Sequence, residues 1–407
     1  MRILGIDLSD TGTILCFYGE EGSLNIPTVI LKEKGRNSWR IGEDAYEALL
    51  VGNGSLTDKL LSFTIKSGIT TIDDKKYNSS DLLKNFFKLS IDKILQLHEG
   101  EYPEEIVVSI PTIDKKTVET IITCFLNLGY KEGHVHVISR AESFIYYCLS
   151  QRKEMRTSHV GLFSLYDLDL TYYELKLQQK SKNPIVFAEQ QKMDESLSLD
   201  VINTPSGAKI ADKVLTSMAE RILKNKIFSS IILTGKGFES IDWAPEFMKM
   251  ICTRRKVFVD EELFARGASF RGSDYAGVNK LFQFVCICEG RIDSSVYIDT
   301  VKDVRSLAYP ISSIGDTWYD KNSVIRLIPY NVKDLELTVI PMDLTKRKSI
   351  HIPLDFLPKR PPRTTMIDVI ASFSNDHTLS ITIKDAGFGE IFPAGNASHT
   401  EEVSLWD

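Results

Sequence analysis

The stretch Gly5–Thr13 reads GIDLSDTGT and joins two apolar runs. The first run ends in the carboxylate of Asp7, and the second, Thr13–Tyr18, follows a short turn rich in hydroxyl groups. This pattern predicts two strands with a tight turn between them. A carboxylate at a strand end can order metal-bound water, and turn amides can approach phosphate oxygens, so the stretch fits a Mg²⁺–phosphate site. A surface hairpin that binds nothing is the alternative.

The chain around this stretch divides into three parts. In residues 1–154, and again in residues 155–278, short apolar runs alternate with amphipathic helical segments, which is typical of an α/β layer fold. In residues 279–393, short alternating runs beginning with Leu281–Cys288 predict an all-β sandwich. Residues 394–407 are expected to form a loosely ordered tail. The similar plan of the first two parts suggests an internal duplication.

Two helical segments and one glycine-bearing turn stand out along the chain. Asp81–His98 and Ala208–Lys224 carry apolar residues near helical spacing, which predicts two long helices. Ile232–Glu239 reads ILTGKGFE, an apolar run followed by glycines that let a ligand approach the backbone closely. An ordinary strand-to-helix turn is the alternative for this last segment.

Taken in order, these segments resemble the actin, hexokinase and heat-shock-chaperone ATPase superfamily, and within it the DnaK-type (seventy-kilodalton heat-shock) chaperones. GIDLSDT is similar to that family's first phosphate motif, GIDLGTT. Further segments resemble family motifs in the same order: Ile26–Ala45, Glu104–Tyr130, Val135–Leu149, Ile231–Phe238, Val259–Phe270 and, for the peptide-binding sandwich, His351–Glu390. The resemblance covers nearly the whole chain and describes a divergent member without the helical lid.

The resemblance implies a two-lobed actin-like ATPase fold followed by an all-β sandwich domain. Lobe I would be residues 1–154, lobe II residues 155–278 and the peptide-binding-type sandwich residues 279–393. The family binds ATP or ADP with Mg²⁺ in the cleft between the lobes. The segment between Leu177 and Ala208 is too short for the subdomain that covers the adenine in this family, so lobe II is expected to be reduced.

The resemblance also implies roles for individual residues. Asp7, Lys66 and Glu142 match catalytic positions, and Asp7 and Asp167 match carboxylates that hold Mg²⁺ through water. The implied nucleotide-binding residues are Ser9, Asp10, Thr11, Thr13, Asp167, Asp169, Thr171, Gly235, Lys236 and Gly237. Two structural alternatives stay open: Lys66 as a solvated helix residue, and Glu142 as an acid favoured at a helix start by the helix dipole.

Several of these positions depart from the family's pattern. Ser9 and Asp10 stand where the family has Gly and Thr, and a carboxylate that faces phosphate oxygens costs energy unless a metal bridges them. The second phosphate motif, DLGGGTFD in the family, is best matched by DLDLTYY from Asp167, which lacks the glycines. Lys236 replaces the second glycine of the adenosine motif. We therefore expect nucleotide binding to be weakened or lost, without efficient ATPase activity.

The composition restricts the partners and the compartment. The chain has 407 residues with 49 Lys and Arg against 55 Asp and Glu, so its net charge of −6 gives no field that draws it to nucleic acid or to an anionic membrane. The N-terminal apolar run meets Asp7 too early for a signal sequence, and no apolar run approaches the roughly 20 residues of a membrane helix. Six scattered cysteines are typical of buried thiols in a reducing compartment. We expect a cytoplasmic protein.

These observations lead to one functional prediction and two alternatives. We predict a DnaK-like, chaperone-related protein whose β-sandwich binds a protein or peptide segment. The first alternative is an active ATPase or sugar kinase of the same superfamily, which would need an intact grip on the phosphates. The second is a structural scaffold that binds no nucleotide.

Overall fold

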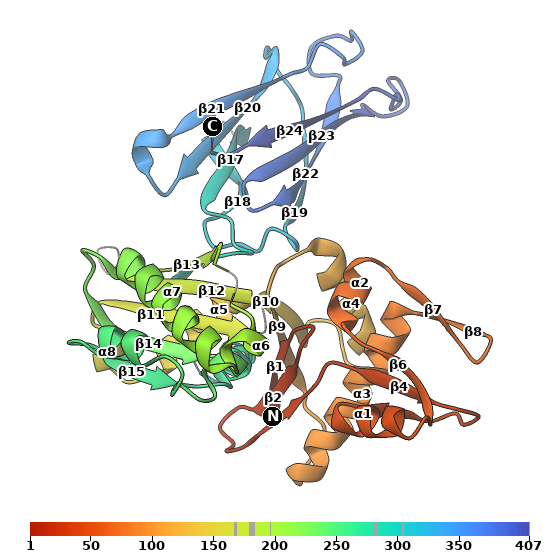
Figure 1. Cartoon of the computed structure of the whole chain (residues 1–407). Coiled ribbons are helices and arrows are strands. Elements are labelled where there is room, and N and C mark those ends of the chain that lie inside the picture. Colours follow the sequence, from red (N-terminus) through yellow and green to blue (C-terminus); the bar gives the residue numbers. More distant parts are fainter. Residues whose placement is uncertain (167–168, 179–183, 196, 280–282, 303–304, 407) are drawn as a thin grey trace. The chain divides into compact units, whose positions relative to one another are not determined.

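The chain folds into two compact units. The computed structural model describes residues 1–166, 169–178, 184–195, 197–279, 283–302 and 305–406. Its contacts separate Met1–Glu289, called the N-terminal unit below, from Gly290–Asp407, called the C-terminal unit. The described part of the N-terminal unit mixes helices with several sheets, whereas that of the C-terminal unit is built from strands and one short 3-10 turn (Figure 1). The predicted order of an α/β region followed by a β-rich region is confirmed.

The N-terminal unit contains two large sheets with the same core topology. The first has the spatial order β10-β9-β1-β2-β3, and the second has the order β15-β14-β11-β12-β13-β16. In the first, β1 pairs antiparallel with β2 and parallel with β9; in the second, β11 pairs antiparallel with β12 and parallel with β14. The strands are β1 (Ile3–Leu8), β2 (Thr13–Phe17), β3 (Ser23–Ile26), β9 (Glu105–Ile110), β10 (Val135–Ser139), β11 (His159–Tyr166), β12 (Asp169–Gln178), β13 (Ile185–Lys192), β14 (Phe228–Thr234), β15 (Lys256–Val259) and β16 (Val285–Ile287). The duplication suggested by the sequence is therefore visible as a repeated strand order.

Two smaller sheets and the helices complete this unit. The smaller sheets are β5-β4-β6 and the hairpin β7-β8, formed by β4 (Ile30–Glu33), β5 (Trp39–Ile41), β6 (Gly54–Thr57), β7 (Ile69–Ile72) and β8 (Lys75–Asn78). The helices are α1 (Glu43–Leu50), α2 (Leu60–Ile65), α3 (Ser79–Leu97), α4 (Lys115–Leu126), α5 (Arg140–Ser150), α6 (Leu199–Ile202), α7 (Pro205–Leu223), α8 (Pro245–Ile251) and α9 (Leu263–Tyr275), with 3-10 turns η1 (Lys153–Arg156) and η2 (Lys236–Phe238). The two long helices predicted from periodicity correspond to α3 and α7.

Local sequence explains where several helices begin. The side chain of Asp114 accepts a hydrogen bond from the Thr117 amide at the start of α4, and Thr204 caps α7 in the same way, with Pro205 at its first position. Ser139 caps α5 by accepting a hydrogen bond from the amide of Glu142. Each cap satisfies a backbone N–H that the helix itself leaves without a partner.

Helices α5 and α9 pack between the two large sheets. Helix α9 contacts β1, β9 and β2 of the first sheet, and α5 contacts β13 of the second. The two helices meet closely at Gly267, where an added Cβ would lie 2.0 Å from the carbonyl oxygen of Ser143. Strand β1 approaches α9 equally closely, since a Cβ at Gly5 would lie 2.1 Å from the carbonyl oxygen of Ala265. Glycine at these two positions sets the short distance between the layers.

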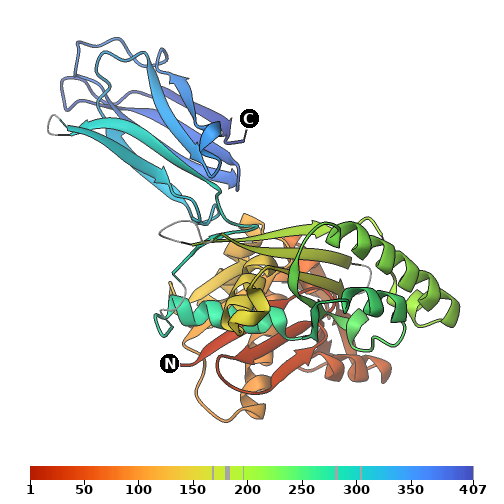
Figure 2. The same ribbon diagram turned by 90° about the vertical axis from the view of Figure 1, so that its left-hand side faces the viewer.

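The C-terminal unit consists of two four-stranded antiparallel sheets, β18-β17-β20-β21 and β19-β22-β23-β24, which lie face to face as two layers (Figure 2). Burial alternates residue by residue along β22 and β23, as expected when one face of a sheet covers a core. The strands are β17 (Ser294–Lys302), β18 (Arg305–Ser312), β19 (Asn322–Leu327), β20 (Asp334–Pro341), β21 (Lys348–Pro353), β22 (Met366–Asn375), β23 (Thr378–Gly387) and β24 (Ser398–Ser404), with the turn η3 (Leu344–Lys346).

The structure places two C-terminal segments differently from the sequence prediction. Strand β16 pairs parallel with β13, so the described part of Leu281–Cys288 belongs to the N-terminal unit and not to the sandwich that was predicted to start at residue 279; residues 280–282 lie outside the described residues. Strand β24 lies within the predicted tail, residues 394–407, because it pairs along its whole length with β23 and buries Val403. Both differences arise from pairing with strands distant in sequence.

None of the helices in the described residues combines the length and the apolar character that crossing a bilayer requires.

Candidate functional site

The predicted phosphate-binding stretch lies at the carboxyl end of β1. Asp7 pairs with Ser109 on β9, and Ser109 pairs with Ile138 on β10, so these three residues form one row across the first sheet. Arg140 lies two residues after Ile138 and is the first residue of α5. The strand register therefore brings an arginine to the carboxylate of Asp7, although the two residues are far apart in the sequence.

Arg140 engages both carboxylate oxygens of Asp7. Its Nε lies 2.9 Å from Oδ1 and its Nη2 lies 2.8 Å from Oδ2, and the exposed fractions of the two side chains are only 5% and 2%. The guanidinium carbon also lies 4.7 Å from the ring centre of Tyr166 and 4.9 Å from that of Phe264. Burial alone would lower the pKa of Arg140, but the Asp7 carboxylate, together with Tyr166 and Tyr173, more than offsets burial and raises that pKa, so Arg140 stays charged. Asp7 thus has a protein cation as its partner.

The turn after β1 is closed by its own side chains. The Ser9 hydroxyl donates to the carbonyl of Gly12 at 2.8 Å and accepts from the Gly12 amide at 3.2 Å. The Ser9 and Thr11 hydroxyls lie 3.3 Å apart, and the Thr13 hydroxyl is 2.7 Å from that of Thr28 in a buried position. The polar groups of this turn that were predicted to meet phosphate therefore bond within the chain.

Asp10 and Lys66 lie at opposite ends of the short helix α2. The Asp10 carboxylate accepts a hydrogen bond from the Ser62 amide at 2.8 Å and another from the Ser62 hydroxyl. Asp10 therefore stabilises the N-terminus of α2, where backbone N–H groups favour a negative charge. Lys66 follows the last residue of α2 and is exposed.

In the second half of the unit, Gly235, Lys236 and Gly237 follow the end of β14. Gly235 has a φ of +95°, and an added Cβ there would lie 2.4 Å from the carbonyl oxygen of Leu165. Glycine is therefore required for packing against β11, independently of any ligand. Thr171 lies on β12 opposite Ser164 of β11. Asp167 lies outside the described residues, and of Asp169 only its backbone position at the start of β12 is described.

A small cavity lies where the two halves of the N-terminal unit meet. Its volume is about 20 Å³, which has room for about one water molecule. Pockets that hold cofactor-sized ligands typically measure about 300–1,000 Å³. Its lining combines predicted and unpredicted residues: Asp7, Thr11, Gly12, Ile14, Asn25, Tyr166, Gly235, Lys236, Glu239 and Glu261. The fold thus brings four of the predicted residues together, but in this geometry the space does not fit a nucleotide with Mg²⁺.

Glu142, the third predicted catalytic residue, lies in another environment. It is 1% exposed, its Oε1 lies 3.0 Å from Nε of Arg271 on α9, and it does not line the small cavity. Arg271 also packs over the rings of Tyr146 and Tyr275. Glu142 therefore contributes to the contact between α5 and α9. A cluster of three or more His, Cys, Asp or Glu side chains suited to a metal is not found in the described part of the chain.

Sequence reasoning missed Arg140 and Tyr166, which complete the surroundings of Asp7. The available signal was an arginine placed two residues after the mostly apolar run Val135–Ile138, at the start of a helix that is otherwise mostly apolar. A charge at such a position predicts a buried partner of opposite sign, because an isolated buried charge is costly. Burial also raises the pKa of Tyr166 to about 12, so its phenol stays neutral beside the pair.

Comparison with known families assigns both units. Residues 12–289 match the family described as "Family of unknown function (DUF5716) C-terminal". The chain belongs to this family. Residues 291–405 match the family described as "Domain of unknown function (DUF8552)". The two matches meet at the same place as the two compact units, Met1–Glu289 and Gly290–Asp407. No curated protein matches the chain.

Proposed function

We propose that the N-terminal unit is a diverged actin-type ATPase domain of the DnaK kind that no longer binds nucleotide, and that the chain acts as a protein-binding scaffold through its C-terminal sandwich. The repeated strand order of the two large sheets, with α5 and α9 packed between them, supports the actin-type assignment. The motif resemblance and the two-sheet C-terminal unit support the DnaK-type assignment.

The observation that carries the proposed loss of nucleotide is the Asp7–Arg140 pair. The buried guanidinium supplies a positive charge at the place where the resemblance puts hydrated Mg²⁺ and phosphate. Replacing a metal by an arginine neutralises the carboxylate without leaving space for a triphosphate. The turn closed by Ser9, the Asp10–Ser62 contact and the cavity of about 20 Å³ point in the same direction.

The sandwich offers one edge strand that suits an added strand from another protein. Edge strands are usually protected by charges or proline. The edges of the two sheets are β18, β21, β19 and β24. Three of them carry such protection: Glu401 and Glu402 on β24, Lys348 and Pro353 on β21, and a proline on β18. The β19 sequence, NSVIRL, contains no proline. Its one charge, Arg326, is bound by both carboxylate oxygens of Asp368 on the neighbouring strand β22, at 2.7 and 2.8 Å.

Exposed apolar side chains accompany this edge. Val324 on β19 is 63% exposed, and the loop that follows presents Ile328, Tyr330 and Val332, each about half exposed. Apolar residues gathered next to a free backbone edge are typical of β-strand addition, in which backbone hydrogen bonds give affinity and side chains give specificity. We therefore assign the protein-binding role to β19.

Thermal unfolding with millimolar Mg²⁺–ATP and Mg²⁺–ADP tests the first part of the proposal. We expect no rise in the melting temperature, whereas a ligand at a hundred times its Kd would stabilise the chain by about 2.7 kcal/mol. We also expect no formation of ADP from ATP, either alone or with a hexose. A rise in melting temperature that is absent in Asp7→Asn would contradict the proposal, and turnover that is absent in that variant would establish the ATPase or kinase alternative.

Selection of peptides from a random phage-displayed library against the full chain tests the second part. We expect extended peptides whose binding, measured by fluorescence anisotropy, is lost in Val324→Lys. Val301→Lys is the matched control, because Val301 is 74% exposed in the same unit but lies on β17. Equal binding to the wild type and Val324→Lys would show that β19 is not the docking edge.

A further inference from the structure

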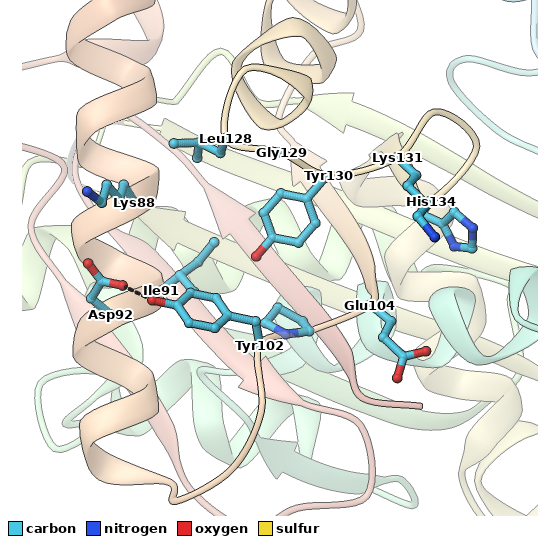
Figure 3. Close-up of a pocket in the computed structure, with 11 residues that line it drawn as sticks. Lys88, Ile91, Asp92, Tyr102, Glu104, Leu128, Gly129, Tyr130, Lys131 and His134 are labelled. Carbon is cyan, nitrogen blue, oxygen red and sulfur yellow. Dashed lines mark hydrogen bonds between the residues drawn. The ribbon is translucent and has the colours of Figure 1, made fainter.

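A cavity with apolar walls lies away from Asp7, beside α3. It is bounded by α3, by the loop after α4 and by the segment before β9 (Figure 3). Its volume is about 610 Å³, which lies within the usual range for small-molecule sites. It shares no lining residue with the small cavity at Asp7. A ligand in this cavity would therefore bind independently of whether a nucleotide binds near Asp7.

The walls of this cavity suit a flat apolar group. Ile91 of α3 and Leu128 of the loop after α4 contribute aliphatic surface, and Tyr102 and Tyr130 contribute rings. The Tyr130 ring is held by an edge-to-face contact with Phe125, with 5.7 Å between the ring centres. A ring fixed in this way can contact a ligand without losing much side-chain freedom.

The two tyrosine hydroxyls in this cavity differ in their hydrogen bonding. The Tyr102 hydroxyl donates to Oδ1 of Asp92 at 2.7 Å. The Tyr130 hydroxyl is covered from solvent and, among the described residues, has no hydrogen-bond partner. It points into the cavity (Figure 3). A covered hydroxyl without a protein partner is a position where a ligand atom or a bound water completes the hydrogen bond.

The charges around the cavity are mixed, with two carboxylates and two ammonium groups that differ in their partners. Asp92 is engaged by Tyr102, and the Glu104 carboxylate lies 3.9 Å from the N-terminal ammonium. Lys88 and Lys131, by contrast, form no ion pair or hydrogen bond within the part of the chain that the structure describes. Both are exposed at the rim, where an ammonium group can reach toward a bound anion.

We propose that this cavity binds a small organic anion with an aromatic body, such as an aryl carboxylate. The ring would lie between Ile91, Leu128 and the two tyrosine rings. The Tyr130 hydroxyl would hydrogen-bond to the anion, and Lys88 or Lys131 would balance its charge. This is a ligand class defined by an apolar ring, one hydrogen-bond acceptor and one negative charge.

Ligand-observed NMR and calorimetry with matched probes test the proposal. Phenylacetate carries both the ring and the charge, phenylacetamide lacks the charge, and acetate lacks the ring. We expect measurable binding of phenylacetate, binding at least about fivefold weaker for phenylacetamide, and none for acetate, because one lost interaction of this kind is worth about that factor. Equal binding of all three probes, or no binding of phenylacetate at millimolar concentration, would overturn it.

Two hydroxyl deletions localise the binding. Tyr130→Phe should fold normally, since it removes a hydroxyl without a partner, and should weaken phenylacetate binding about fivefold. Tyr102→Phe is the matched control and should change the affinity less than twofold, because its hydroxyl is already bound to Asp92. Lys88→Gln combined with Lys131→Gln should remove the preference for phenylacetate over phenylacetamide. Equal affinity in the wild type and Tyr130→Phe, or a preference that survives both lysine substitutions, would place the probe elsewhere and refute the assignment.

Discussion

Each unit contains a buried aspartate held by an arginine through two hydrogen bonds, but the two pairs are built differently. In the N-terminal unit, Arg140 contacts Asp7 at 2.9 and 2.8 Å and packs between aromatic rings. In the C-terminal unit, Arg360 contacts Asp385 at 2.7 Å through each of two nitrogens. Both aspartate side chains are almost completely covered, with exposed fractions of 2% and 0%.

The difference lies in the backbone. Asp385 also accepts hydrogen bonds from the amides of Gly387 and Gly395, at 3.0 and 2.7 Å, and Arg360 donates to the carbonyl of Pro393. The bonds that the structure gives for the carboxylate of Asp7 come from Arg140 alone. The C-terminal pair therefore joins two loops, the one between β21 and β22 and the one between β23 and β24, whereas the N-terminal pair fills the end of a strand. An aspartate supported by several donors tolerates the loss of one of them better than an aspartate with a single partner.

The largest effect is expected when Arg140 is replaced. Arg140→Met leaves the Asp7 carboxylate buried without its cation, and such a change typically costs about 3–5 kcal/mol. Denaturant unfolding of the wild type and the variant measures the loss. The double variant Asp7→Leu with Arg140→Met removes both charges and should recover most of the stability, because a buried pair can be replaced by apolar residues at little net cost. A single variant as stable as the wild type would show that the pair is solvated in solution.

A smaller effect is expected in the sandwich. Asp385→Asn keeps one oxygen that can accept a backbone hydrogen bond but loses the doubly bonded contact with Arg360, and we expect a loss of about 2 kcal/mol. Thermal unfolding, with amide exchange of residues near Gly387 and Gly395, locates the change. Asp368→Asn is the matched control: Arg326 also holds Asp368 by two bonds, but Arg326 is exposed, and solvent weakens such a pair. If both variants lose the same free energy of unfolding, burial does not make the Arg360–Asp385 pair more stabilising than the Arg326–Asp368 pair.

The smallest and most gradual effect is that of pH. Hydrogen bonds from Arg360, together with the amides of Gly387 and Gly395, lower the pKa of Asp385 from 3.8 to about 2. Because the pKa is lower in the folded state than in the unfolded state, its stabilising contribution is complete above about pH 4 and is lost as the pH falls toward 2. Urea unfolding between pH 5 and pH 2 should therefore show the wild type and Asp385→Asn converging. A constant difference over this range would contradict the assigned shift.

Much of the architecture could be predicted from local pattern. The apolar periodicity of Asp81–His98 and Ala208–Lys224 predicted α3 and α7, because one face of each helix must be buried. The change to short alternating runs after residue 279 predicted the β-rich region. The same reasoning missed β24 and assigned the segment that contains β16 to the sandwich, since a short strand is defined by the strand it pairs with, and that partner can lie anywhere in the chain.

The site could be predicted only in part. The sequence motifs predicted that Asp7, Thr11, Gly235 and Lys236 would come together, and the small cavity does bring them together. They did not predict that Arg140 would reach Asp7, or that Ser62 would bind Asp10. Both contacts depend on strand register and helix placement between distant segments, which motif spacing does not contain.

The sequence by itself determined the residue types at each strand end and the periodicities that make one unit α/β and the other β-rich. Tertiary structure alone decided which charges meet, because a buried carboxylate takes its character from the groups packed around it. For Asp7 that group is a guanidinium held between aromatic rings. The same carboxylate beside open space could bind a metal ion. The packing of α5 against the end of β1 instead places Arg140 against it.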